Sequence, residues 1–174
     1  MSPSNPPGPD KPQVLRETDE AARSQARAFV QNSAHGALAT LEPGTHWPLA
    51  SRVSLAADAQ GSPLILISRL SAHYGALEAD ARCSLLLGET GVGDPLLHPR
   101  ITVLCLAEKV GAGHRAAAKA AFLQRHPQAE IYADFGDFDF WTLVPQCASL
   151  NAGFGKAYAL TAEDLKLAKR DDFG

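Results

Sequence analysis

Residues 49–87 limit the possible folds of this chain more than any other segment does. The run PLASRVSLAAD is followed by a turn at AQGSP, and then by LILISRL, SAHYGALEAD and ARCSLLLGE. These runs predict two β-strands joined by a Gly-Pro turn, then a short helix, then a third strand. Because parallel neighbours need a crossover of a dozen or more residues, such short connections favour antiparallel pairing.

The remainder of the chain shows the same alternation of short strands and turns. Further strands are predicted at His35–Leu41, Ile101–Val110, Phe138–Leu143, Ala148–Leu150 and Phe154–Leu160. Helices are predicted over residues 14–32, from the N-cap Ser71 to about Ala79, over His114–Arg125, and after the cap residue Thr161. Six or seven antiparallel strands with about four helices favour a mainly β fold that closes into a small barrel.

Length and charge narrow the class of protein. The 174 residues suffice for one domain with a core, which we predict over residues 14–174, after a Pro-rich disordered tail at 1–13. A net charge of −3 argues against nucleic acid as a partner, since phosphate backbones require basic surfaces. No apolar run is long enough to span a bilayer, and the first residues lack the apolar core of a signal peptide. We therefore expect a cytoplasmic protein that binds neither nucleic acid nor membrane.

The cysteines and acidic residues do not predict a metal site. Cys83, Cys105 and Cys147 are far apart, with no metal-binding spacing, and their apolar neighbours favour buried free thiols. Asp134, Asp137 and Asp139 alternate with aromatic residues, but no second acidic motif accompanies them.

A group of polar residues lies where the LILIS strand gives way to the short helix. Ser68, Arg69, Ser71 and His73 occur together there, and Arg52 on the preceding strand is within reach. Free amides at a helix start, with hydroxyls and cations beside them, are suited to a phosphate. Ser71 is also explained by capping its helix alone, and Arg52 by pairing with an acidic side chain.

A second candidate anion contact lies in the segment NAGFGKA. Gly153 and Gly155 indicate a bend, and the segment lacks the GxGxxG pattern and the βαβ context of a dinucleotide site. Lys156 follows this bend and is a candidate to face a bound anion.

The ordered succession GALAT, SRVS, LILISRLSAHYGALEADARCSLLL, ITVLCLAEKV and LVPQCASLNAGFGKA resembles the pyridoxamine 5′-phosphate oxidase-like split-barrel family. Within that family it is most similar to the haem-utilisation branch of the HugZ type. The resemblance covers residues 14–165 and depends on order and spacing rather than on one motif. It implies a six-stranded antiparallel split β-barrel that forms a homodimer, with FMN bound at sites in the subunit interface.

Carried over by position, Arg52 corresponds to the family's arginine at the FMN phosphate, and Ser71 and His73 to its Ser-Arg-Lys phosphate-binding run. The full set of residues that the resemblance implies at the cofactor is Arg52, Val53, Ser54, Ile67, Ser68, Ser71 and His73. Three departures reduce the positive charge: Ala72 replaces an arginine, His73 a lysine, and Ala57 a further lysine. The C-terminal Arg-x-His motif of true pyridoxamine phosphate oxidases is absent, which argues against vitamin B6 oxidation.

These observations leave three functions open. The first is an FMN-dependent oxidoreductase acting on a small-molecule substrate, in which the flavin carries the chemistry and no side chain is identified as catalytic. The second is haem binding in the same dimer cleft, although no histidine follows His126 and the choice among His35, His46, His98 and His114 stays open. The third is a cofactor-free split-barrel dimer.

Overall fold

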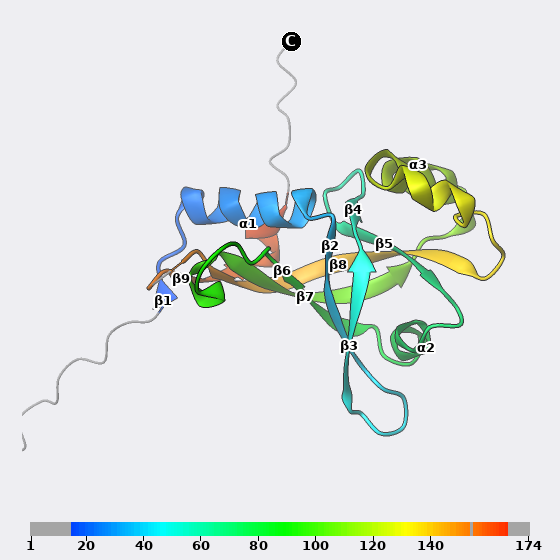
Figure 1. Ribbon diagram of the computed structural model, residues 1–174, viewed down its shortest axis with the longest axis horizontal. Helices are drawn as coiled ribbons and strands as arrows, with labels where there is room; N and C mark the ends of the chain where they lie inside the picture. The colour runs from blue at the N-terminus through cyan, green and yellow to red at the C-terminus, as the bar shows by residue number, and fades with distance from the viewer. Residues whose placement is uncertain (1–14, 154, 167–174) are drawn as a thin grey trace, which may run out of the picture.

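The computed structural model describes residues 15–153 and 155–166, so the tail predicted at 1–13 lies outside the described residues. Figure 1 shows a twisted, partly closed sheet with helices at its margins. Six longer strands form the barrel: β2 (His35–Leu41), β3 (Pro48–Ser54), β5 (Pro63–Ser68), β6 (Arg82–Leu87), β7 (Arg100–Lys109) and β8 (Phe138–Asn151). This confirms the predicted mainly β split barrel.

The strand order explains why the barrel is split. Strands β3, β2, β6, β7 and β8 follow one another, and β5 pairs with the first part of β8, all antiparallel. Strands β3 and β5 approach each other without a ladder between them, so the barrel is open along that seam. Beyond β8 lie β9 (Ala157–Thr161) and the two-residue β1 (Leu15–Arg16), which pairs parallel to β9, whereas β4 (Ala56–Ala57) pairs with β5.

Strand β8 is one strand of 14 residues, where the sequence predicted two shorter ones. It continues through Pro145 because a bulge falls there: Leu104 pairs with Cys147 but Cys105 pairs with Pro145, which leaves Gln146 as an extra residue. The extra residue changes which side chains point inward. Ala148 and Leu150 face the core beyond the bulge, and Trp141 and Leu143 face it before the bulge.

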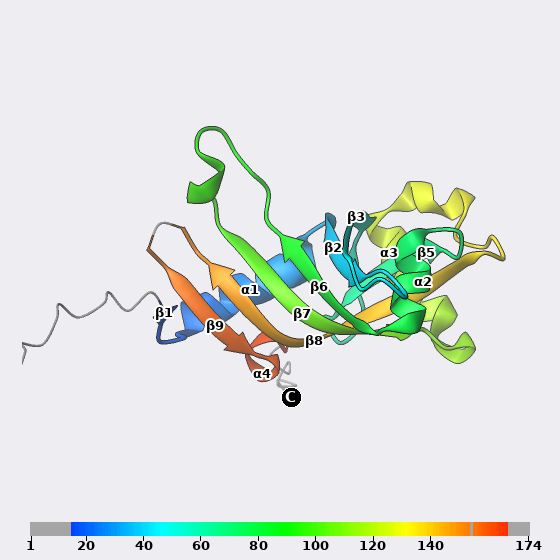
Figure 2. The ribbon, with the colours of Figure 1, turned by 90° about the horizontal axis from the view of Figure 1, so that it is seen from below.

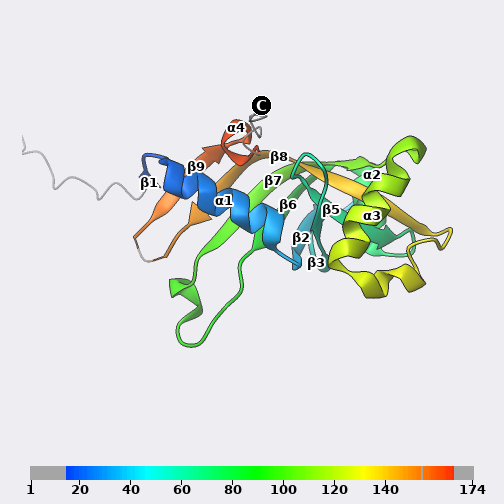
Figure 3. The ribbon, with the colours of Figure 1, turned by 90° about the horizontal axis from the view of Figure 1, so that it is seen from above.

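The main core fills the barrel and continues under α1 (Glu20–Asn32). This helix buries Ala22, Ala26 and Val30, spaced four residues apart, against the sheet, and Figure 3 shows it lying across the strands. The helix begins later than predicted because Asp19 caps it, accepting the backbone N–H of Ala22 at 2.7 Å.

A second, smaller apolar cluster lies outside the barrel, under α3 (Arg115–Arg125). Phe122 of this helix packs against Phe140 of β8 and Leu64 and Leu66 of β5. The remaining helices are α2 (Ala72–Ala79), between β5 and β6, and α4 (Ala162–Leu165), which Thr161 caps as predicted. Short 3₁₀ turns lie at Pro95–Leu97, Ala112–His114 and Pro127–Ile131.

None of the helices in the described ranges has the length and apolar character needed to cross a membrane.

Candidate functional site

The segment from Ser68 to His73, here called the α2 corner, is the place where the sequence predicted a phosphate site. Its hydroxyl groups are already bonded within the protein. The Ser68 hydroxyl donates to Asp137 Oδ2 at 2.7 Å and accepts the Leu70 N–H, while the Ser71 hydroxyl donates to the Ser68 carbonyl at 2.7 Å. Ser71 occupies the N-cap position of α2 but makes no side-chain capping bond.

Behind the α2 corner lies a buried carboxylate, Asp139. Its Oδ2 accepts hydrogen bonds from Arg69 Nε at 2.8 Å and from the Tyr74 hydroxyl at 2.6 Å, and lies 2.8 Å from Lys109 Nζ. The guanidinium of Arg69, and then Lys109, lower the pKa of Asp139, outweighing the opposing effect of burial. Arg69, which the sequence placed beside the phosphate, is therefore bonded to a carboxylate.

Two cationic or titratable groups among the predicted cofactor residues remain without a described partner. Arg52 is exposed on β3, and no described carboxylate pairs with it. His73 is half-buried on the first turn of α2, and burial lowers the pKa of its imidazole. Together with the free amides of the first turn of α2, these groups are what this region offers to a ligand.

The structure brings most of the predicted cofactor residues into one region. Ile67 and Ser68 end β5, Ser71 and His73 follow them, and the seam brings β3, with Arg52, Val53 and Ser54, beside β5. Val53 and Ile67 are buried in the barrel core, whereas Arg52 and Ser54 are exposed. Lys156 lies apart, exposed in the turn between β8 and β9, at the end of β8 opposite to Ser68 (Figure 1).

The side of the sheet away from α1 carries exposed apolar side chains. We call this side the outer face and define it by the outward residues Leu86 of β6 and Leu104 and Leu106 of β7. Arg52 belongs to the same side, since it pairs with Ala37, and Ala37 pairs with Leu86. Figure 2 shows this side, where no described helix crosses the middle of β6 and β7.

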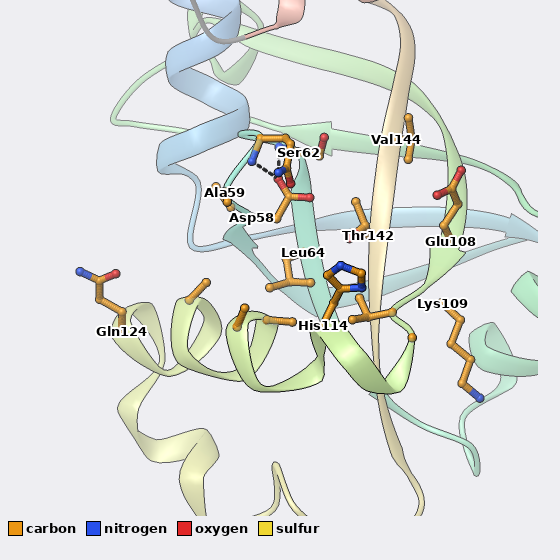
Figure 4. Close-up of a pocket in the computed structure, with 17 residues that line it drawn as sticks. Asp58, Ala59, Ser62, Leu64, Glu108, Lys109, His114, Gln124, Thr142 and Val144 are labelled. Carbon is orange, nitrogen blue, oxygen red and sulfur yellow. Dashed lines mark hydrogen bonds between the residues drawn. The ribbon is translucent and has the colours of Figure 1, made fainter. Parts of the chain in front are cut away.

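Sequence reasoning missed a cleft of about 790 Å³ beside α3, here called the α3 cleft. Its floor is Leu64 of β5 with Thr142 and Val144 of β8; its walls are α3 and the β4–β5 turn. Figure 4 shows His114 at the start of α3 over this floor, and Lys109 extended away from it. Among the described residues, no group of His, Cys, Asp and Glu is arranged to hold a metal ion.

The α3 cleft exists because the helix face that borders it is made of small residues. Ala117, Ala118 and Ala121 line the cleft, and their short side chains leave space that longer ones would fill. This Ala-rich helix was visible in the sequence, but the facing strands were not, so a cleft did not follow from it.

The open seam, the antiparallel strand order and the α2 corner together define a split-barrel protein of the pyridoxamine 5′-phosphate oxidase-like kind. The model of the family described as CREG, beta-barrel matches residues 17–166. The chain belongs to the CREG β-barrel family.

Several relatives are similar over most of the chain. The chloroplastic heme oxygenase HOZ of Arabidopsis thaliana is 32% identical over 162 residues, 88% of this chain and 50% of that protein. A heme-binding protein from Mycobacterium smegmatis is 30% identical, with a TM-score of 0.76 over 87% of this chain and 61% of that one. The heme storage protein HutZ from Vibrio cholerae, at 20% identity, shares the fold, with a TM-score of 0.63 over 75% of this chain and 93% of that one. The chain spans about half the length of its plant relative.

Proposed function

We propose that this protein binds haem and takes part in its storage or breakdown. The observation that carries the proposal is the 32% identity to a heme oxygenase over 88% of the chain, supported by 30% identity to a heme-binding protein. The α2 corner adds a physical argument. Its two serine hydroxyls and Arg69 are bonded within the protein, and Asp137 and Asp139 lie beside them, which makes the region less favourable for a phosphate dianion.

An absorbance titration with haemin tests this function. We expect a saturable Soret band that differs from the band of free haemin, because a protein ligand to the iron changes its electronic structure. A protein without a haem site, in the same buffer, controls for nonspecific haemin uptake. A titration in which absorbance rises only in proportion to added haemin, without saturation, would contradict the proposal.

A flavoprotein is the second candidate, favoured by one specific observation. Arg52 is exposed, lacks a described partner, and lies on β3, which approaches β5 across the seam. If this region binds FMN, the flavin would supply redox chemistry toward a small-molecule substrate, and Arg52 would hold its phosphate. The FMN assignment is tested by incubating the protein with FMN, desalting it and measuring the flavin fluorescence that it retains. If the protein retains flavin, the Arg52→Ala variant should lose it.

Both the FMN assignment and a cytoplasmic location stay predictions.

We further propose that the functional unit is a homodimer formed through the outer face. Leu86, Leu104 and Leu106 are 46%, 48% and 38% exposed on adjacent strands, which is more apolar surface than a sheet face in water usually carries. A second copy related by a two-fold axis would cover this face with the same residues of its own. Arg52, on the same side, would then lie at the edge of the interface.

Replacing Leu104 by arginine tests the dimer. An unpaired guanidinium buried in an apolar interface is unfavourable, so we expect the dimer dissociation constant to rise by about 100-fold or more. Light scattering coupled to gel filtration measures the change. Ile131→Arg is the matched control, because Ile131 is 77% exposed on a 3₁₀ turn away from the outer face. A dimer unaffected by Leu104→Arg would exclude this face as the interface.

A further inference from the structure

The surroundings of the six histidines separate those that are already bonded from those that are free. The imidazole of His126 bonds to the Leu55 carbonyl at 2.7 Å and packs on the ring of Phe122. His98 bonds to the Val92 carbonyl at 3.2 Å, and His35 lies 3.1 Å from a Glu89 oxygen. An iron ligand needs an imidazole nitrogen that faces a space large enough for the macrocycle.

Three imidazoles have no hydrogen-bond partner within the described part of the chain, and only one of them borders the α3 cleft. His46 is on the exposed β2–β3 turn, in a left-handed conformation with φ of 58°, and His73 is half-buried at the start of α2. His114 is exposed, precedes the first residue of α3, and lines the α3 cleft. Figure 4 places its ring over the cleft floor.

The α3 cleft has the size and lining that a flat organic molecule requires. Its volume of about 790 Å³ is within the range of sites for drug-sized ligands, about 300–1,000 Å³. Ala117 and Ala121 form one wall, and Leu64 and Val144 contribute apolar floor. Because these wall residues are small, space remains between α3 and the strands of the floor, where a planar ring fits.

The charges of the lining determine how such a ligand would be oriented. Asp58 and Glu108 line the cleft, and the ammonium of Lys109 is turned away to Asp139, 2.8 Å distant. Carboxylates disfavour anionic groups nearby, so the acidic side chains of a porphyrin would point away from Asp58 and Glu108. The same carboxylates make the cleft unsuitable for the phosphate of FMN.

Resting on the haem function proposed above, we infer that an iron porphyrin binds in the α3 cleft with the His114 imidazole as its axial ligand. The cleft adjoins the outer face, because Leu106 is the register partner of Val144 and Glu108 of Thr142. A second copy on the outer face would therefore approach the open side of the cleft. This assignment selects one histidine among those that the sequence leaves open.

The first test is spectroscopic and uses the full chain loaded with haemin. His114→Ala should lose the axial-imidazole absorbance and electron paramagnetic resonance signature, and added imidazole should restore it. His46→Asn is the control, because asparagine tolerates the left-handed backbone at that exposed turn. His35→Ala is the competing variant. An unchanged spectrum in His114→Ala, or loss of the signature in His35→Ala alone, overturns the inference while leaving haem binding intact.

The second test fills the cleft without touching the histidine. Ala121→Trp places an indole in the α3 cleft, and we expect the dissociation constant for haemin to rise at least about tenfold, a loss of about 1.4 kcal/mol. Ala120→Trp on the exposed side of the same helix should leave it unchanged. Equal affinities for the two variants overturn the assignment of the cleft. If the unsubstituted protein fails to bind haemin, the proposed function itself fails, which is a different result from any of these.

Discussion

Replacing Phe122 by alanine is expected to lower the free energy of unfolding by about 3–5 kcal/mol. The ring is 1% exposed, lies edge-on to Phe140 with centroids 5.7 Å apart, and holds α3 against the outside of the barrel. Its removal leaves a cavity in a small cluster that has few other large side chains to collapse into the space. Urea denaturation followed by circular dichroism measures the change.

The matched control for this prediction is Phe135→Ala. Phe135 is 54% exposed and makes one edge contact, with Phe138. We expect its substitution to cost less than about 1 kcal/mol. Equal losses in the two variants would mean that the cluster under α3 does not hold the helix in place. Because α3 forms a wall of the α3 cleft, Phe122→Ala should also weaken binding of any molecule that occupies the cleft.

Replacing Asp139 by alanine is expected to lower the free energy of unfolding by about 2–3 kcal/mol. Removing one partner of a buried ion pair costs about 3–5 kcal/mol, but here the two cations left behind reach water. The side chains of Arg69 and Lys109 are 51% and 40% exposed, so their charges are not trapped. Asp139→Asn retains an acceptor oxygen and should lie between the wild type and Asp139→Ala. Thermal and urea unfolding at pH 7 measure the series.

The pH dependence of this difference identifies its electrostatic origin. Because Arg69 and Lys109 lower the pKa of Asp139 in the folded protein, the carboxylate contributes its full stabilisation above the ordinary aspartate pKa of about 3.9. The difference between wild type and Asp139→Ala should shrink as the pH falls below that value. Asp134→Ala is the control, since Asp134 pairs with Lys119 at the surface and should cost less than about 1 kcal/mol. A difference independent of pH would indicate lost packing instead.

The sequence predicted the strands and the short helix closely, because these elements follow from local patterns. Apolar runs and turn residues located β2 and α2 to within a residue of their observed bounds, and placed β5 and β6 at the runs LILISRL and ARCSLLLGE. The prediction of two separate strands at Phe138–Leu143 and Ala148–Leu150 is wrong here, because the bulge at Gln146 lets β8 continue through Pro145. The same bulge leaves Cys147 on the exposed side, so the prediction of three buried thiols holds for Cys83 and Cys105 only.

The contacts that determine the candidate site could not be predicted in the same way. Arg69 and Ser68 were interpreted as phosphate ligands, but their partners Asp139 and Asp137 lie about 70 residues further along the chain. No local pattern indicates that these aspartates face the α2 corner. The α3 cleft was missed for a related reason: a cleft results from what the facing elements leave empty, and that depends on the pairing of β5 with β8.

The extra residue at Gln146 gives β8 two halves whose inward and outward positions are exchanged relative to a regular strand. Deleting it would put the two halves of β8 out of phase, so that either Trp141 and Leu143 or Ala148 and Leu150 would turn out of the barrel. One codon at this position therefore determines which side chains face the interior and which remain available to a ligand. An insertion or deletion at Gln146 would therefore destabilise the fold far more than adding or removing several residues in the loop between β6 and β7.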